Sequence, residues 1–273
     1  LLVAINIAIS VFGLAGNSVV IWICGCKMKR TVITTWYISL AVSDLLFCAL
    51  LPLEVYYNIT LHWPFGLVLC KLASSAMFLN MYSSVFLLVL ISMDRCLMVF
   101  FPVWSHNPFV ALVWLLSALL TFPSMIFRQV TAHGAVTQCH TNYTSHSTHE
   151  AVVLVRFTCG FLIPFLMIVC CCLLFAVKLR SLTIRSSKPY KVIAALILSF
   201  FSCWVPYHSF IFLELDLKNN SVEIIQTGLK VGATLAAANS FVSPFLYVFV
   251  GNNFKQMLKH SWKSRMEEAA GED

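Results

Sequence analysis

Residues Cys70–Arg95 read CKLASSAMFLNMYSSVFLLVLISMDR, and this stretch decides the fold. No charged residue occurs between Lys71 and Asp94, and the side chains between them are apolar or small. As a helix the stretch rises about 37 Å, which exceeds the roughly 30 Å hydrocarbon layer of a bilayer. We therefore predict a membrane-spanning helix with Cys70 at one membrane surface and the Asp94–Arg95 pair at the other.

Six further apolar runs flank this helix in a chain of 273 residues that is 60% hydrophobic and only 11% charged. This composition is far from that of a soluble domain. We predict an all-α membrane protein that forms one domain over residues 1–273, a bundle of seven transmembrane helices. The predicted spans are 1–25, 34–57, 68–101, 109–127, 151–178, 188–215 and 222–250. The chain begins inside an apolar run, so we expect an N-terminal tail to be missing from it.

The segment 253–266 follows the last span and has an amphipathic pattern. Phe254, Met257 and Trp262 fall on one helical face, and lysines fall on the other. Such a pattern predicts a short eighth helix that lies on the membrane surface.

The lysine and arginine residues near the span ends predict the orientation. Thirteen of the eighteen lie on one side, among them Lys27 and Arg95. Three Asn-x-Ser/Thr sequons, at Asn58, Asn142 and Asn219, fall on the other side and predict glycosylation there. The N-terminus is therefore expected outside the cell and the C-terminus inside. The net charge of +7 does not form a continuous stripe, which argues against a nucleic-acid partner.

The chain has eleven cysteines. Nine of them fall within spans or at their cytoplasmic ends, where a thiol is usually a small apolar residue. Only Cys70 and Cys139 fall in predicted outer regions, so we expect one disulfide between them.

Asp44 lies inside the second span, where a charge is costly and usually functional. One carboxylate with several neutral oxygens suits a hard cation such as sodium. The alternative is a water-filled polar network that only holds the helices together. The residues that would form either arrangement are Asp44, Asn80, Ser84, Asn239 and Ser243.

Two proline breaks complete a set of landmarks along the chain, Pro206 in CWVP (203–206) and Pro244 in SPFLY (243–247). The other landmarks are Asn17, Asp44, Cys70, Asp94-Arg95-Cys96, Trp114 and Pro164. Together they resemble the rhodopsin-like (class A) family of G-protein-coupled receptors over the whole chain. Further motifs are similar to its chemoattractant branch, which includes the formyl-peptide, complement anaphylatoxin, chemerin and second prostaglandin D receptors and related orphans. These motifs are WPFG (63–66), LNMY (79–82), PVW (102–104), RSSKP (185–189) and YVFVG (247–251).

The resemblance implies roles that residue spacing does not give. Asp94 would hold Arg95 at rest and release it to a G-protein helix when the sixth span swings outward. Trp204 would sit under the ligand and pass its movement to neighbouring residues. The rest of this activation switch would be Val85, Pro164, Phe200, Pro206, Pro244 and Tyr247. The resemblance also implies a sodium pocket at Asp44, a G protein of the inhibitory class, arrestin and membrane lipids as partners, and no cofactor besides an allosteric sodium ion.

The chain departs from the family pattern at several positions. Cys96 replaces the tyrosine of Asp-Arg-Tyr, and Ser243 replaces the asparagine of Asn-Pro-x-x-Tyr. Cys172 stands where the fifth span usually carries a tyrosine, so the active state would lose a hydroxyl that meets Tyr247 through water. The 19 residues from Arg95 to Trp114 are fewer than this branch leads us to expect.

Arg156 is the leading candidate for a ligand contact. It lies eight residues before Pro164, about 12 Å along the helix, where an arginine needs an anionic partner or a water-filled cavity. Its planar fork favours a bidentate carboxylate, and the alternative is snorkelling to the outer interface. Arg128 and Lys230 are equally compatible with interfacial anchoring. The other predicted ligand-binding residues are Glu54, Phe78, Met81, Tyr82, Arg128, Tyr207, His208 and Lys230.

These observations predict a plasma-membrane receptor, not an enzyme, that acts in chemotaxis and inflammation. Its ligand would be a chemoattractant with an anionic group, either a peptide C-terminus or a lipid carboxylate, and it would signal mainly through inhibitory G proteins. Cys172 and Ser243 motivate an alternative, a decoy that binds a chemoattractant without signalling. A membrane transporter or a retinal pump is a third possibility. A retinal pump needs a lysine in the middle of the last span, and Lys230 lies near its outer end.

Overall fold

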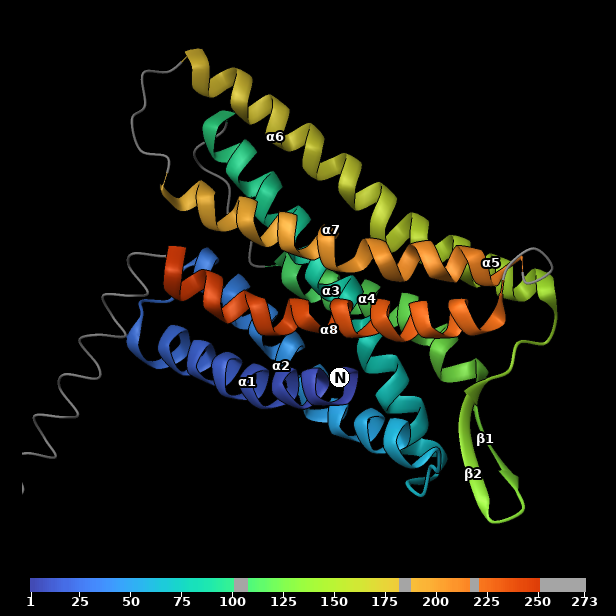
Figure 1. Ribbon diagram of the computed structural model, residues 1–273. Coiled ribbons are helices and arrows are strands. Elements are labelled where there is room, and N and C mark those ends of the chain that lie inside the picture. Colours follow the sequence, from blue (N-terminus) through green and yellow to red (C-terminus); the bar gives the residue numbers. More distant parts are fainter. Residues whose placement is uncertain (101–107, 182–187, 217–220, 251–273) are drawn as a thin grey trace, which may run out of the picture.

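The computed structural model describes residues 1–100, 108–181, 188–216 and 221–250. Its helices pack side by side in one bundle, which confirms the predicted seven-helix fold (Figure 1). The first span consists of α1 (Leu2–Trp22) and a π-helical turn, η1 (Ile23–Lys27). The fifth consists of α5 (His146–Phe157), a second π-helical turn, η2 (Thr158–Leu162), and α6 (Ile163–Ser181). The other spans are α2 (Val32–Thr60), α3 (Gly66–Phe100), α4 (Pro108–Phe127), α7 (Lys188–Glu214) and α8 (Val222–Val250).

The observed helix bounds differ from the predicted ones mainly in the fifth span, which begins at His146 rather than at Ala151. Ser145 explains the earlier start, because its side-chain oxygen accepts a hydrogen bond from the Thr148 backbone N–H over 3.2 Å and so caps the helix. The predicted surface helix at 253–266 lies outside the described residues.

The long helix α3 is the central element of the bundle. In the membrane-spanning part of α3, 72% of the residues are buried, against 17% in the span that contains α6. α3 packs against α2, α4 and α6 and also contacts α7. At its middle, Val85 is buried with Phe200 and Trp204 of α7 in the main hydrophobic core. The charge-free stretch of the sequence therefore forms the central helix of the bundle, against which other helices pack.

The π-helical turn η2 divides the fifth span where that span packs closely against α3. A Cβ atom added at Gly160 would lie 2.6 Å from the Met81 Cε atom and 3.0 Å from the Tyr82 ring. Only a glycine fits at this distance without a shift of its neighbours. Pro164 follows one turn later, so the break in the helix coincides with a residue that cannot donate a backbone hydrogen bond.

A β-hairpin crosses one end of the bundle between α4 and α5 (Figure 1). The antiparallel strands β1 (Arg128–His133) and β2 (Val136–Thr141) pair along their full length, with Val130 opposite Cys139. Gly134 begins the two-residue turn with a φ of +63°, as a type II′ turn requires. The sequence analysis predicted only an outer segment here. We call this end of the bundle the hairpin end, and the opposite end, which carries Arg95, the Arg95 end.

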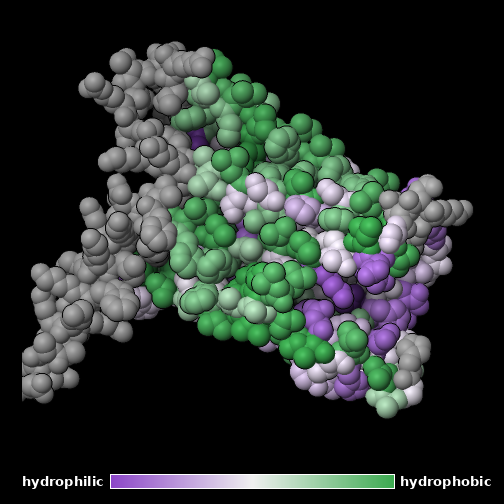
Figure 2. Space-filling model, in the orientation of Figure 1, coloured by the Kyte–Doolittle hydropathy of each residue, from purple (hydrophilic) through white to green (hydrophobic). Residues whose placement is uncertain are grey.

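The outer surface of the bundle is apolar along the helices. Figure 2 shows hydrophobic side chains over most of the helical surface and hydrophilic ones gathered around a hollow at the hairpin end. Within the described residues, six helical spans are long and apolar enough to cross a membrane. α8 is not among them, and polar residues recur along it, including Glu223, Lys230 and Asn239. α8 nevertheless packs against α1 and α7 as part of the bundle.

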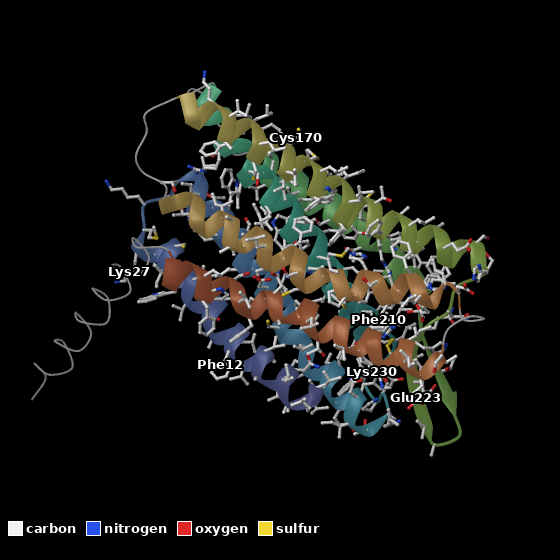
Figure 3. The ribbon with its side chains drawn as sticks, turned by 45° about the horizontal axis from the view of Figure 1, so that its top comes forward. Phe12, Lys27, Cys170, Phe210, Glu223 and Lys230 are labelled. Atoms are coloured by element: carbon white, nitrogen blue, oxygen red, sulfur yellow. A yellow bond between two sulfur atoms is a disulfide. The ribbon has the colours of Figure 1, made fainter. Side chains whose placement is uncertain are left out.

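Two glycines allow α7 and α8 to lie in direct contact. A Cβ atom at Gly232 would lie 2.7 Å from the Tyr207 Cα atom and 2.8 Å from its backbone nitrogen. One turn earlier, Gly228 leaves room for the ring of Phe210, which projects from α7 at the hairpin end (Figure 3). At Gly232 the obstacle is backbone, which cannot rotate away as a side chain can.

We predict that Gly232→Ala destabilises the protein by about 1–3 kcal/mol, because the added methyl group forces α8 away from the α7 backbone. The measurement is the midpoint of thermal unfolding of the purified protein in detergent. Gly25→Ala is the matched control, since a Cβ atom there meets nothing within 4 Å. Equal midpoints for the two variants would contradict the packing argument.

Candidate functional site

A cavity of about 1150 Å³ opens at the hairpin end of the bundle. Residues from α1, α2, α3, α4, α5, α7, α8 and both strands line it, so it lies at the centre of the bundle rather than between two helices. Its lining is mixed, with apolar residues such as Phe47 and Ile211 between charged ones. The ionisable residues of the lining, tyrosines apart, are Glu54, Arg128, His146, His149, Arg156, Glu214, Asp216 and Lys230.

Arg156 is the most deeply buried cation of this cavity, with only 8% of its surface exposed. Its Nη2 atom donates a hydrogen bond to the Ser124 hydroxyl over 2.9 Å. Its Cζ atom lies 3.6 Å from the centre of the Phe78 ring, which is a cation–π contact. Among the described residues, no carboxylate forms an ion pair with Arg156. A buried charge held only by neutral groups is suited to receive an anion.

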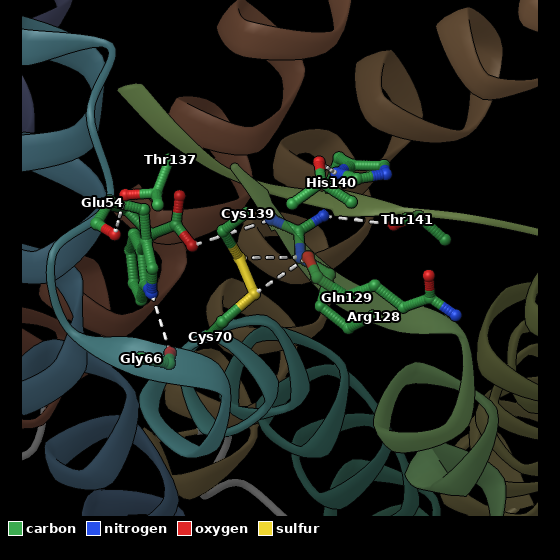
Figure 4. The surroundings of a disulfide bond; sticks show 11 residues. Glu54, Gly66, Cys70, Arg128, Gln129, Thr137, Cys139, His140 and Thr141 are labelled. Atoms are coloured by element: carbon green, nitrogen blue, oxygen red, sulfur yellow. Dashed lines mark hydrogen bonds and ion pairs between the residues drawn. A yellow bond between two sulfur atoms is a disulfide. The ribbon is translucent and has the colours of Figure 1, made fainter. Parts of the chain in front are cut away.

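Arg128, by contrast, is already paired. It begins β1, and its Nη2 atom lies 4.0 Å from the Glu54 Oε1 atom (Figure 4). Its Nη1 atom donates to the Thr141 hydroxyl over 3.0 Å, and its Nε atom lies 3.2 Å from the Cys139 sulfur. Arg128 therefore lines the cavity with much of its charge compensated.

The predicted disulfide between Cys70 and Cys139 is confirmed (Figure 4). It joins the first turns of α3 to β2, and both cysteines are almost completely buried. On the neighbouring side, the Thr137 hydroxyl donates to the Trp63 carbonyl over 2.6 Å. These links hold the hairpin over the bundle and so position Arg128 at the cavity.

The other predicted ligand residues fall into two groups. Glu54, Phe78, Tyr207 and Lys230 line the cavity, and Figure 3 shows Lys230 on α8 at the hairpin end. The second group, Met81, Tyr82 and His208, is buried and does not line the cavity. Tyr82 and Met81 belong to the main core, and the ring of His208 packs against Phe157, Phe161 and Trp204.

The sequence analysis missed a polar cluster between α5 and the end of α7. The His149 Nε2 atom lies 3.6 Å from the Glu214 Oε2 atom. The His146 Nδ1 atom lies 3.2 Å from the Glu150 Oε1 atom, and its Nε2 atom lies 3.3 Å from the Leu215 carbonyl oxygen. The spacing of the two histidines, three residues apart before an apolar run, was a visible signal. Their partners on α7 are distant in sequence and come close only in the fold.

A second polar group lies deeper in the bundle, at the predicted sodium residues. The Asn80 amide nitrogen donates to the Asp44 Oδ1 atom over 2.8 Å, and the Ser240 hydroxyl donates to the Asn80 oxygen over 3.2 Å. The Ser243 hydroxyl donates to the Asn239 backbone carbonyl over 3.1 Å. The second Asp44 oxygen and the Ser84 hydroxyl are buried and have no hydrogen-bond partner among the described residues.

This arrangement fits a hard cation better than a transition metal. It offers a carboxylate oxygen, hydroxyl oxygens and an amide oxygen, the donors that such cations prefer. Across the parts of the chain that the structure describes, no three His, Cys, Asp or Glu side chains gather as they would around a bound metal ion.

The residues of the predicted switch are distributed along α3, α6, α7 and α8. Trp204 lies beneath the cavity, with its ring centre 6.0 Å from Phe200 and 5.9 Å from Tyr207. Val85 is fully buried in the same core, and Pro164 is buried on α6. Pro206 and Pro244 lie inside α7 and α8, and Pro244 packs near Gly16 of α1.

At the Arg95 end, the Arg95 Nη2 atom lies 3.3 Å from the Asp94 Oδ2 atom. The Asp94 side chain is almost completely buried, so this pair is shielded from solvent. The side chain of Tyr247 lies outside the described residues.

Two of the three sequons lie at the hairpin end. Asn58 lines the cavity and is exposed in the last turns of α2. Asn142 follows β2 and is exposed, with its amide nitrogen 3.3 Å from the Gln129 side-chain oxygen. Asn219 lies outside the described residues.

Comparison with known proteins assigns the family. The sequence model described as "7 transmembrane receptor (rhodopsin family)" matches residues 16–247, which is most of the chain. The chain belongs to this family. It is therefore a multi-pass membrane receptor with a seven-helix fold and not an enzyme.

The similar proteins include chemerin-like receptors and C3a anaphylatoxin chemotactic receptors. Chemerin-like receptor 1 of Rattus norvegicus is 40% identical over 302 residues, covering 100% of this chain and 81% of that receptor. Chemerin-like receptor 1 of Homo sapiens is 37% identical over 301 residues, covering 100% and 80%. The C3a anaphylatoxin chemotactic receptor of Oncorhynchus mykiss is 38% identical over 281 residues, covering 96% and 77%. These relatives place the chain in the chemoattractant branch of the rhodopsin family, as its motifs predicted.

Proposed function

We propose that this protein is a cell-surface receptor for a chemoattractant that carries an anionic group, and that it signals mainly through G proteins of the inhibitory class. The observation that carries the ligand assignment is Arg156, a buried guanidinium in a large cavity that no described carboxylate neutralises. A carboxylate that reaches Arg156 would make charge-assisted hydrogen bonds in a poorly hydrated environment, where they are strong.

The hairpin end is the extracellular end in this proposal. Asn58 and Asn142, two glycosylation sequons, lie exposed there, and the buried disulfide belongs to the same end. Lys27 lies at the other end (Figure 3), as expected for the cytoplasmic side under the positive-inside rule. The cavity then opens to the medium, and the Arg95 end faces the G protein and arrestin. N-glycosylation of both asparagines is part of the proposal.

The chemical class of the ligand is either a peptide C-terminus or a lipid carboxylate. Relatives are named as receptors for the proteins chemerin and C3a, which favours the peptide. A cavity of about 1150 Å³ is large enough for several residues of such a peptide. Phe78, which stacks on Arg156, would contact the apolar part of either ligand.

A row of contacts between aromatic rings leads from Arg156 to Trp204 and supports a mechanism by which ligand binding activates the receptor. Arg156 stacks on Phe78, whose ring centre is 6.2 Å from that of Tyr207, which in turn packs against Trp204. A ligand that moves Arg156 or Phe78 therefore changes the packing around Trp204 and Phe200. The agonist acts by population shift, because it favours the arrangement that it binds more tightly. In that arrangement Arg95 leaves Asp94 and becomes available to the G protein.

We predict that Arg156→Ala weakens binding of a carboxylate ligand by about 1.5–3 kcal/mol, or roughly 10- to 150-fold, because a charge-assisted hydrogen bond is lost. The probes are fluorescent peptides with the C-terminal sequences of chemerin and C3a and a fluorescent oxidised fatty acid. Binding is measured on purified receptor in detergent.

Comparing acid and amide peptides on both the wild type and Arg156→Ala isolates the contribution of the ligand carboxylate. Peptides with a C-terminal amide should bind the wild type less tightly, and Arg156→Ala should no longer distinguish amide from acid. Lys71→Ala is the matched control, because Lys71 is a cation near the hairpin end that does not line the cavity. If Arg156→Ala retains the full preference for the acid, the assignment of Arg156 is wrong.

The polar group around Asp44 is the proposed sodium site. Asp44, Asn80, Ser84, Asn239 and Ser243 would supply the oxygens, and the unpartnered Asp44 and Ser84 oxygens support this assignment. A bound sodium ion would supply positive charge that offsets the buried carboxylate. No other cofactor is proposed.

We predict that sodium chloride stabilises the wild type against heat more than choline chloride at equal ionic strength does. The expected difference is about 1 kcal/mol when sodium is several times above its dissociation constant. Asp44→Asn should abolish it, because the carboxylate is lost. Ser92→Ala is the control, since the Ser92 hydroxyl donates to Leu88 of its own helix. A sodium effect that persists in Asp44→Asn would rule out this site.

The alternative function is a decoy that binds a chemoattractant without signalling. Two departures favour it, Cys172 on α6 and Ser243 on α8. Nucleotide exchange on purified inhibitory G protein distinguishes the two functions. We expect agonist-stimulated exchange that depends on Arg95, measured with Arg95→Ala as the control. Ligand binding without any stimulated exchange would favour the decoy.

A further inference from the structure

The first turns of α5 carry a stripe of polar residues that leads to Arg156. His146, His149 and Arg156 are separated by three and seven residues, so they lie on the same face of α5. His149 and Arg156 are two helical turns, about 11 Å, apart along the axis. All three residues line the cavity. The two histidines therefore lie between the ligand-binding arginine and the cavity mouth.

His146 is held between two hydrogen-bond acceptors. Its Nδ1 atom faces the Glu150 carboxylate at 3.2 Å, and its Nε2 atom faces the Leu215 carbonyl oxygen at 3.3 Å. A neutral imidazole carries one N–H group and can donate to only one of them. The imidazolium ion carries two N–H groups and can donate to both.

His149 faces charges of both signs. On α7, the Glu214 carboxylate lies 3.6 Å from its Nε2 atom. Burial of the imidazole disfavours its charged form, as do His146 and Arg156 on α5, whereas Glu150 favours it. From the segment before α5, the Tyr143 ring stacks on the imidazole with ring centres 4.5 Å apart. Protonation would give an ion pair with Glu214 and also repulsion from Arg156.

The charge of the cavity depends on these two histidines. With neutral histidines, three cations (Arg128, Arg156 and Lys230) balance three acids (Glu54, Glu214 and Asp216) among the lining residues. Histidine changes charge between about pH 5 and 8, so mild acid would add up to two positive charges to this lining.

We propose that His146 and His149 couple ligand binding to protons, so that the cavity binds an anionic ligand more tightly in mild acid than at neutral pH. This inference rests on the proposed function, in which the ligand carries a carboxylate to Arg156. Protonation also ties α5 to the end of α7 through Leu215 and Glu214.

The direction of the effect follows from linkage. Without a ligand, Arg156 disfavours a second and third positive charge on the same face of α5. A bound carboxylate offsets this repulsion, so binding takes up protons, and the affinity must rise as the pH falls. A peptide C-terminus stays ionised at pH 5.5, because its ordinary pKa is about 3.5. The ligand itself therefore does not titrate in this range.

The test measures the affinity of the fluorescent C3a and chemerin C-terminal peptides at pH 7.5 and 5.5 on purified receptor. We expect the wild type to bind about three- to tenfold more tightly at pH 5.5, the size of one or two added charges acting across about 10 Å. The double variant His146→Gln/His149→Gln should change less than twofold. His140→Gln is the matched control, because His140 lies on β2 and does not line the cavity. It should behave as the wild type does.

The outcomes separate this inference from the proposed function. If the wild type binds neither peptide at any pH, the peptide form of the proposed function fails, and proton coupling of peptide binding fails with it. If the wild type binds with an affinity that does not rise in acid, only the proton coupling is overturned. A rise that persists in the double variant overturns the assignment to these two histidines.

A second variant covers the case in which the double variant does not reach the membrane. Glu214→Gln removes the acid that stabilises protonated His149. Between the two pH values, the logarithm of the peptide affinity of this variant should change at most half as much as that of the wild type. An undiminished change in Glu214→Gln would contradict the role of the α5–α7 contact.

Discussion

A membrane offers no hydrogen-bond partners, so a polar side chain that this bundle buries is stabilised by partners within the protein. The Asn17 amide joins α1 to α8 through the Ser240 carbonyl, and the Asn80 amide joins α3 to α2 through Asp44. These contacts fix which helix faces which. Arg156 differs from these residues, since its partners among the described residues are a neutral hydroxyl and an aromatic face. The fold thus leaves the charge of Arg156 available to an anion from outside the chain.

Much of the fold could be predicted because it depends on local properties of the sequence. Length and apolar content gave the seven spans, and the position of Cys70 and Cys139 outside them gave the disulfide. The hairpin was missed, although Gly134 between two runs rich in β-branched residues is a recognisable signal. The contact between His149 and Glu214 could not be predicted, because 65 residues separate them and only helix packing brings α5 to the end of α7.

Arg156, the aromatic core and the Asp94–Arg95 pair form one column along the axis of the bundle. Arg156 and Phe78 lie at its top, Trp204 and Val85 at its middle, and Arg95 at its base. Glycines keep the column compact, because Gly160 and Gly232 bring the flanking helices to within contact distance of it. A movement of side chains at either end of this column therefore displaces tightly packed neighbouring atoms.

The π-helical turn η2 has an implication for comparing this protein with its relatives. Such a turn holds one residue more than a regular turn, so everything before it is rotated by about 100° relative to an unbroken helix. Arg156 and both histidines precede the turn, and Pro164 follows it. A residue-by-residue alignment to a receptor whose fifth helix lacks this insertion would assign these side chains to the wrong neighbours. Ligand specificity on this helix can therefore diverge through a single inserted residue, without any substitution at the contact positions themselves.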